Sequence, residues 1–326
     1  MAQGDPDGGG QTSTVLLERR KVRIGRLSEK GFEERLSCGL GGQTQATRIF
    51  FFDVDGDGRE ELIVSAVENG LPASLVLKVD GEACRTLVSR ARWSLRVIDV
   101  PEGIGEHAVK GRALVGQAWS TQSFFSGPIR EMALKGDRLV SGRTLDLPKR
   151  AALFEFAYLP ATDGAASVAV LKGWASLEVY GQEGRRWKRR WRSGERFGGS
   201  ANAVAARQRP ALDEVASDNV IFGLPPIGLV APQALSFLAV KQEMPTRGIV
   251  GREPYVRGGE VVGFVPDPAF TFAADRRTQA VPGAIVDAII GTFGTSGGAK
   301  LLVLFQEDVG AFEIPQKSSV LAFEMW

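Results

Sequence analysis

The feature that most constrains the fold is a short apolar run that recurs along the chain and is closed each time by turn-forming residues. Aliphatic or β-branched residues followed by Gly, Pro, Asp or Asn are typical of β-strands joined by tight turns. No window of the sequence keeps a helical period over three turns. Examples of these runs are Val15–Leu17, Leu62–Val64, Val168–Leu171 and Leu301–Leu304. The chain is therefore expected to be all-β.

The runs belong to a longer repeat that also contains an acidic turn. Asp5–Gly10 precedes Val15–Leu17, and Asp53–Gly58 precedes Leu62–Val64, 48 residues later. A repeat of about 40–50 residues with about four strands is the signature of a β-propeller blade. The other inner strands begin near Ala113, Val168, Phe237 and Leu301. Six inner strands predict one β-propeller domain over residues 1–326, with six or seven four-stranded blades.

The two ends of the repeat series look incomplete. The first copy begins at its loop, without the strand that should precede Asp5, and the chain ends on the strand-like segment Ser319–Trp326. Propellers usually close by pairing strands from both termini in one blade. We therefore expect the sequence to be truncated at its N-terminus.

Composition excludes several classes of protein. Hydrophobic residues at 44% and charged residues at 24% match a globular chain and exclude a disordered one. A net charge of +2 gives no general attraction to nucleic acid. No apolar run is long enough to span a bilayer, and the polar start Met1–Asp7 does not resemble a signal peptide.

The motif with chemistry in it is the acidic loop between Asp53 and Glu61. Calcium takes six to eight oxygen ligands from carboxylates, carbonyls and water, and it favours acids at alternate positions around a glycine turn. The expected ligands are the carboxylates of Asp53, Asp55, Asp57 and Glu61 and the backbone oxygen of Arg59. An EF-hand is excluded, because position twelve is Val64 and both flanks read as strands. We predict a Ca²⁺ site here.

The pattern Asp-x-Asp-Gly-Asp-Gly-x-x-Glu-Leu at residues 53–62 resembles the calcium loop of FG-GAP or VCBS repeats, which form β-propellers in integrin α chains and bacterial envelope proteins. Other copies depart from it. The first has Gly9 and Ser13 in place of acids, and the copy near Val168 keeps only Asp163. The copy near Leu301 has Thr292, Gly294 and Ser296. The metal site is therefore expected once.

The resemblance implies a non-enzymatic scaffold that presents loops of one face to a protein or glycan ligand. It also implies a location outside the cytoplasm: periplasmic, outer-membrane-associated or secreted. The alternative is a propeller-type hydrolase or lyase with acids around a central channel. No catalytic residue stands out, since His107 is the single histidine and lies in a Gly/Pro-rich stretch without a nucleophile motif.

The densest basic segment is Gly184–Arg192. Strand alternation places Trp187, Arg189 and Trp191 on one face and the basic residues of the other parity on the opposite face. That second row is a candidate binding surface for phosphates or stacked bases. The rival interpretation is an outer strand whose tryptophans pack on the next blade and whose charges protect an edge, and a nucleic-acid partner is not favoured. The row consists of Arg186, Lys188, Arg190 and Arg192.

The two cysteines fall near outer strands of the first two repeats. Cys38 and Cys84 occupy different points along the repeat. Opposite ends of a strand exceed the ~7 Å Cα separation that a disulfide allows. We expect two unpaired thiols.

Overall fold

The structure is a computed structural model that describes most of the chain. The described residues are 1–18, 20–101, 108–109, 111–120, 123–149, 151–160, 166–172, 174–199, 203–205, 219–229, 236–243, 256–266, 271–294, 298–307 and 318–325. Within them every regular element is a β-strand, which confirms the all-β prediction. In these ranges nothing helical has the length and apolar character of a membrane span.

The chain divides into two compact units. Unit 1 comprises Met1–Leu145, Val204–Val220 and Ile290–Lys300, and unit 2 comprises Asp146–Ala203, Ile221–Ile289 and Leu301–Trp326.

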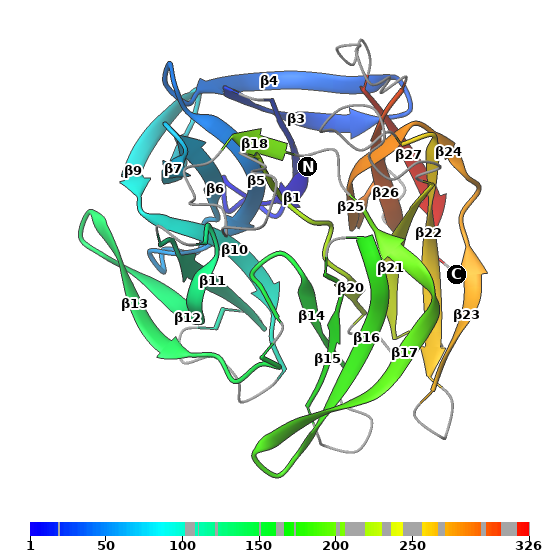
Figure 1. Cartoon of the computed structure of the whole chain (residues 1–326). Helices are drawn as coiled ribbons and strands as arrows, with labels where there is room; N and C mark the ends of the chain where they lie inside the picture. The colour runs from blue at the N-terminus through cyan, green and yellow to red at the C-terminus, as the bar shows by residue number, and fades with distance from the viewer. Residues whose placement is uncertain are drawn as a thin grey trace. The chain divides into compact units, whose positions relative to one another are not determined.

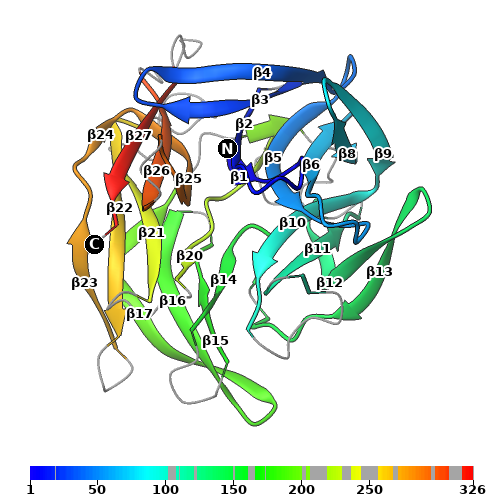
Figure 2. The same ribbon diagram turned by 180° about the vertical axis from the view of Figure 1, so that it is seen from behind.

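Unit 1 contains three antiparallel four-stranded meanders, coloured from blue to green in Figure 1 and seen from behind in Figure 2. The first is β1 (Ala2–Gly4), β2 (Ser13–Leu17), β3 (Lys21–Ser28) and β4 (Gly31–Gly39). The second is β5 (Gln45–Phe52), β6 (Glu61–Glu68), β8 (Ser74–Asp80) and β9 (Ala83–Ala91), with β7 (Leu71–Pro72) beside β6. The third is β10 (Trp93–Asp99), β11 (Arg112–Ala118), β12 (Ser126–Lys135) and β13 (Arg138–Thr144).

Consecutive meanders pack with matching strands side by side. First strands contact one another (β1 with β5, β5 with β10), as do last strands (β4 with β9, β9 with β13). Because neighbouring sheets cover both of its faces, β6 is buried from Glu61 to Val67. One apolar cluster containing Ile24 and Leu62 joins the first two sheets, and another containing Ile63 and Leu114 joins the second and third. This packing fixes the loop that β5 and β6 carry.

Unit 2 contains the fourth four-stranded meander and one further meander that is less regular. The fourth is β14 (Phe156–Leu159), β15 (Ser167–Val170), β16 (Trp174–Glu183) and β17 (Arg186–Gly198). The less regular one is β20 (Ile227–Gly228), β21 (Phe237–Glu243), β22 (Gly258–Pro266) and β23 (Phe272–Arg277), with β24 (Val281–Pro282) beside β22. The two are joined where Gly198 of β17 pairs in parallel with Lys241 of β21.

Two further small sheets contain the remaining strands. The pair is β18 (Ala203–Ala205) with β19 (Asn219–Ile221), and the three-stranded sheet is β25 (Ala284–Thr292), β26 (Ala299–Gln306) and β27 (Ser318–Glu324).

All six apolar runs predicted as inner strands are strands, but the predicted number of blades is wrong. In the described chain four regular four-stranded blades of the β-propeller type are complete, not six or seven. The later sheets are reduced, since β20 has only two residues and the sheet of β25 has three strands.

Gly228 of β20 shows one local constraint, because a Cβ there would lie 2.3 Å from the carbonyl oxygen of Tyr158.

The expectation that the first meander lacks its innermost strand is also wrong. β1 pairs with β2 through Ala2, Gln3 and Gly4. The Gln3 side chain extends this pairing to the end of β25. Its Nε2 donates to the carbonyl oxygen of Thr292 at 2.7 Å, and its Oε1 accepts from the Thr292 N–H at 2.7 Å. A side-chain amide thus supplies the donor and acceptor that a strand backbone would.

Candidate functional site

The acidic loop Asp53–Glu61 links the end of β5 to the start of β6 and is folded around Asp53. The Gly56 N–H donates to Asp53 Oδ1 at 2.8 Å, and the Gly58 N–H donates to Asp53 Oδ2 at 3.0 Å. Both glycines have a positive φ, 77° and 87°, which side chains with a Cβ rarely adopt. The Asp-x-x-Gly-x-Gly spacing is therefore what lets one carboxylate close the turn.

The other three carboxylates each accept one backbone hydrogen bond. The Asp57 N–H donates to Asp55 Oδ1 at 3.2 Å, and the Arg59 N–H donates to Asp57 Oδ1 at 3.0 Å. The Val54 N–H donates to Glu61 Oε2 at 3.0 Å. Glu61 has no exposed surface. The predicted ligand side chains are therefore brought together on one short loop.

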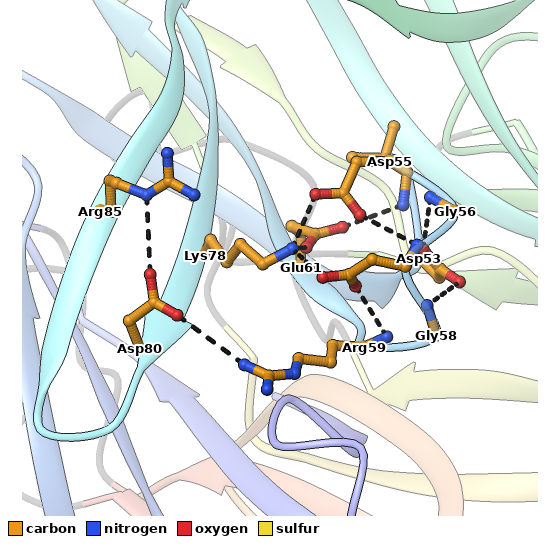
Figure 3. A network of polar contacts seen from close by, with 11 residues as sticks. Asp53, Asp55, Gly56, Gly58, Arg59, Glu61, Lys78, Asp80 and Arg85 are labelled. Atoms are coloured by element: carbon orange, nitrogen blue, oxygen red, sulfur yellow. Dashed lines mark hydrogen bonds and ion pairs between the residues drawn. The ribbon is translucent and has the colours of Figure 1, made fainter.

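A lysine that the sequence analysis did not identify lies at the centre of these acids (Figure 3). Lys78 Nζ is 2.7 Å from Asp55 Oδ2, 2.6 Å from Asp57 Oδ2 and 3.0 Å from Glu61 Oε1. Only 8% of its side chain is exposed. β8 holds it there, because Leu77 pairs with Leu62 of β6 and Lys78 follows directly. The signal in the sequence is a lysine within the apolar run Leu75–Val79.

Charge and burial act in opposite directions on this group of side chains. Burial by itself lowers the pKa of Lys78, but the hydrogen bonds to Asp55, Asp57 and Glu61 outweigh it and the pKa rises above its ordinary value. Burial raises the pKa of Glu61, opposed by the bonds from Val54 and Lys78. The bond from Lys78, followed by that from the Arg59 backbone, lowers the pKa of Asp57.

The loop has the oxygen donors that calcium prefers, but the lysine stands among them. Single carboxylate oxygens of Asp53, Asp55 and Glu61 lie within 4.8 Å of one another, close enough to hold one ion. Asp55 and Glu61 nevertheless each direct an oxygen at Lys78. Arg59, whose backbone oxygen was the fifth predicted ligand, pairs through its side chain with Asp80 at 3.8 Å. With Lys78 in this position the donor set does not fit a calcium ion.

The first acidic loop repeats the same fold 48 residues earlier. The Gly9 and Gly10 N–H groups donate to the two carboxylate oxygens of Asp5, at 3.2 and 2.7 Å. Gly8 and Gly10 have positive φ, like Gly56 and Gly58. The two loops also touch, since the N–H of Asp5 donates to Glu60 Oε2 at 2.8 Å. The repeat read from the sequence is thus a repeat of structure.

The two cysteines form a disulfide, so the expectation of unpaired thiols is wrong. Cys38 lies near the end of β4 and Cys84 near the start of β9, with a Cα–Cα distance of 5.9 Å. This distance falls within the range that a disulfide needs. The strands are the last of their sheets and contact each other, which brings different points of the repeat together. The bond crosslinks the first two blades.

The basic segment forms the outer strand of the fourth meander, but its alternation is broken. Val179 pairs with Trp191 and Tyr180 with Arg189, so Arg190 is an extra residue in a β-bulge. A bulge shifts the later residues to the opposite face of the sheet. Trp187 and Trp191 therefore lie on opposite faces, contrary to the prediction that they share one.

The two tryptophans have different surroundings. Trp191 is partly buried and packs edge-on against Phe264 of β22 and Phe272 of β23, with ring centroids 5.7 and 5.6 Å away. Trp187 Nε1 donates to Asp146 at 3.1 Å.

Acidic side chains of β16 face most of the predicted basic row. Glu183 pairs with Lys188 and Arg190, and Glu178 lies 4.0 Å from Arg192. The hydrogen bond from Lys188, together with the charge of Arg190, lowers the pKa of Glu183. Arg186 is exposed at the end of the hairpin. Residues 174–198 hold seven basic and three acidic side chains, a net charge of +4.

His107 and Asp163 lie outside the described residues.

No family model and no curated protein matches the chain. Among solved structures it is similar to a complex of S. cerevisiae Dbp5 with Nup159, Gle1, IP6 and ADP, at 10% identity and a TM-score of 0.35, covering 94% of this chain and 70% of that one. It is also similar to BBS1N in complex with ARL6DN, at 13% identity and a TM-score of 0.40, covering 93% and 74%. Similarity at this level supports no inference about function. The resemblance to FG-GAP and VCBS repeats stays a prediction.

Proposed function

We propose that the chain is a non-enzymatic β-propeller scaffold that works outside the cytoplasm and binds a negatively charged protein or glycan through the β16–β17 hairpin. The observation that carries this proposal is the +4 charge of residues 174–198, in a chain whose total charge is only +2. A surface of one sign attracts ligands of the other sign and speeds their association. In the described residues no observation favours the hydrolase or lyase alternative, which stays a prediction.

Two features of the hairpin support its use as a contact surface. β16 and β17 are the longest strands of their meander, 10 and 13 residues, and Arg186, Lys188 and Arg190 are exposed. Trp191 packs against the neighbouring sheet and holds the base of the hairpin. A surface carried on paired strands also loses less conformational entropy on binding than a free loop does.

Retention on an immobilised sulfated polysaccharide tests the binding surface. Arg185→Ser/Arg186→Ser removes two charges from the end of the hairpin, and Arg138→Ser/Arg143→Ser removes two exposed charges from β13 as a matched control. We expect the hairpin variant to elute at clearly lower salt than the wild type, and the control to elute with the wild type. Equal losses in both variants would show that only total charge matters, and no loss in either would exclude the surface.

The disulfide supports the location. Disulfides persist in oxidising compartments and are rare in the cytosol. Cys38 and Cys84 are the chain's two cysteines. Thiol trapping with a maleimide polymer in native cells tests this. We expect no mass shift before reduction and a two-thiol shift after it. A two-thiol shift in untreated cells would place the protein in a reducing compartment.

A further inference from the structure

We propose that Lys78 is the built-in cation of the acidic loop. Its ammonium stands where the resemblance to FG-GAP and VCBS repeats places Ca²⁺, so that the loop folds without metal. Removal of the ammonium would uncover a calcium site. The proposal is independent of the ligand-binding role of the hairpin, because it concerns β5, β6 and β8.

The donors and acceptors around the loop match in number. The four carboxylates of Asp53, Asp55, Asp57 and Glu61 offer eight oxygens. Five accept from the backbone N–H groups of residues 54, 56, 57, 58 and 59. The remaining three, one each on Asp55, Asp57 and Glu61, face Lys78 Nζ. A lysine ammonium has three N–H donors and no acceptor. Asp55 and Asp57 accept hydrogen bonds from this ammonium, and Glu61 Oε1 forms an ion pair with it at 3.0 Å. Each carboxylate oxygen of the loop therefore lies against either a backbone N–H group or the ammonium.

The strands around Lys78 also fix it in place. β8 pairs with β6 on one side and β9 on the other, with Lys78 opposite Arg85. The Lys78 side chain is 8% exposed and Glu61 is fully buried. A calcium ion at the same carboxylates would sit within a few ångströms of the ammonium, where two like charges repel strongly. Calcium binding would therefore require Lys78 to leave a buried position.

The first acidic loop, which has lost two of the acids, also lies against basic side chains. There Arg35 Nη1, from β4, donates to Asp7 Oδ2 at 2.7 Å. Thr14 of β2 pairs with Gly25 of β3, so Arg26 is the counterpart of Lys78 in the first meander. Arg26 approaches the same loop through Gln11, at 3.5 Å. In both acidic loops of unit 1, basic side chains from the same sheet therefore lie against the loop.

Thermal melting of the full chain in calcium and in chelator tests the proposal. The wild type should melt at the same temperature in millimolar CaCl₂ and in EGTA, and calorimetric titration with Ca²⁺ should show no binding. Lys78→Met, which keeps most of the apolar stem, should melt lower than the wild type in EGTA. It should recover by roughly 2–4 °C or more in CaCl₂ through mass action on the folded state.

Two variants control for charge and for the ligands. Arg85→Ala removes a neighbouring positive charge that pairs with Asp80 at 3.6 Å, outside the loop, and should leave the melt insensitive to calcium. Lys78→Met/Asp55→Ala should lose the calcium recovery. A wild-type protein that binds Ca²⁺ in the titration would overturn the proposal, and this measurement needs no variant. A Lys78→Met protein as stable as the wild type in EGTA would also overturn it.

Discussion

Removal of the disulfide between Cys38 and Cys84 should strongly destabilise unit 1. The bond closes a loop of 46 residues between the last strands of the first two blades. In the chain-entropy treatment, a closed loop of this length restricts the unfolded chain enough to stabilise the fold by about 4 kcal/mol. Cys38→Ala/Cys84→Ala should therefore lose most of these ~4 kcal/mol. Alanine adds no buried polar group at the Cys38 position, so the loss reports the missing crosslink.

Urea denaturation measures the loss, and hydrogen exchange assigns it to a unit. With an m-value of about 3 kcal/mol/M, a loss of about 4 kcal/mol lowers the unfolding midpoint by roughly 1.3 M. Peptides from β3, β4, β8 and β9 should exchange faster in the double variant. Peptides from β14–β17, in the unit without cysteines, should keep their protection.

The wild type provides the matched control. A reducing agent should lower its midpoint to that of the double variant, while the variant itself should not respond to reductant. An unchanged wild-type midpoint on reduction, with both thiols free to react beforehand, would refute the reasoning. That result would restore the sequence-based expectation of two separate thiols.

Three other substitutions test the packing, the charges and the strand pairing. Trp191→Ala should cost up to about 3 kcal/mol in urea melts, the low end of the range for emptying a large buried side chain, because the partly buried indole packs against two phenylalanine rings. The hydrogen bond from Lys241 is the main cause that lowers the pKa of Glu195 in the fold. The ionised carboxylate therefore stabilises the fold at a pH above its unfolded pKa of about 4.3, and this stabilisation is lost as the pH falls through the lower pKa of the folded state. Glu195→Gln should flatten the acid limb of a curve of stability against pH. Gln3→Ala should cost about 1–3 kcal/mol and speed exchange of the Thr292 amide, because the hydrogen bonds of the Gln3 side chain to the Thr292 backbone and to Thr14 are lost.

Much of the fold follows from local sequence signals. Apolar runs and turn residues are short-range features, and all six runs predicted from them are strands. The Asp/Gly pattern is equally local, because a carboxylate that accepts from two amides three to five residues later needs only neighbouring backbone. The Asp53 loop could therefore be predicted, and its repetition at Asp5 as well.

Features that depend on contacts between strands could not be predicted in the same way. The bulge at Arg190 shifts Trp191 to the other face, and nothing in the alternating pattern marks the extra residue. The disulfide depends on how β4 meets β9, which one strand at a time does not reveal. The predicted number of blades is wrong for a related reason. An apolar run identifies one strand and does not show whether the sheet around it has four strands.

Lys78 shows why a motif identifies a loop more securely than it identifies the ion in that loop. The Asp-x-Asp-Gly-Asp-Gly pattern determines how the backbone turns and where carboxylates gather, and these acids require positive charge from some source. The source is set 17 residues after Glu61, by one position on β8. An apolar residue there would leave three carboxylate oxygens without partners and favour a metal. A lysine pairs its one covalently attached charge with the same three oxygens, so the identity of residue 78 determines whether this loop requires calcium.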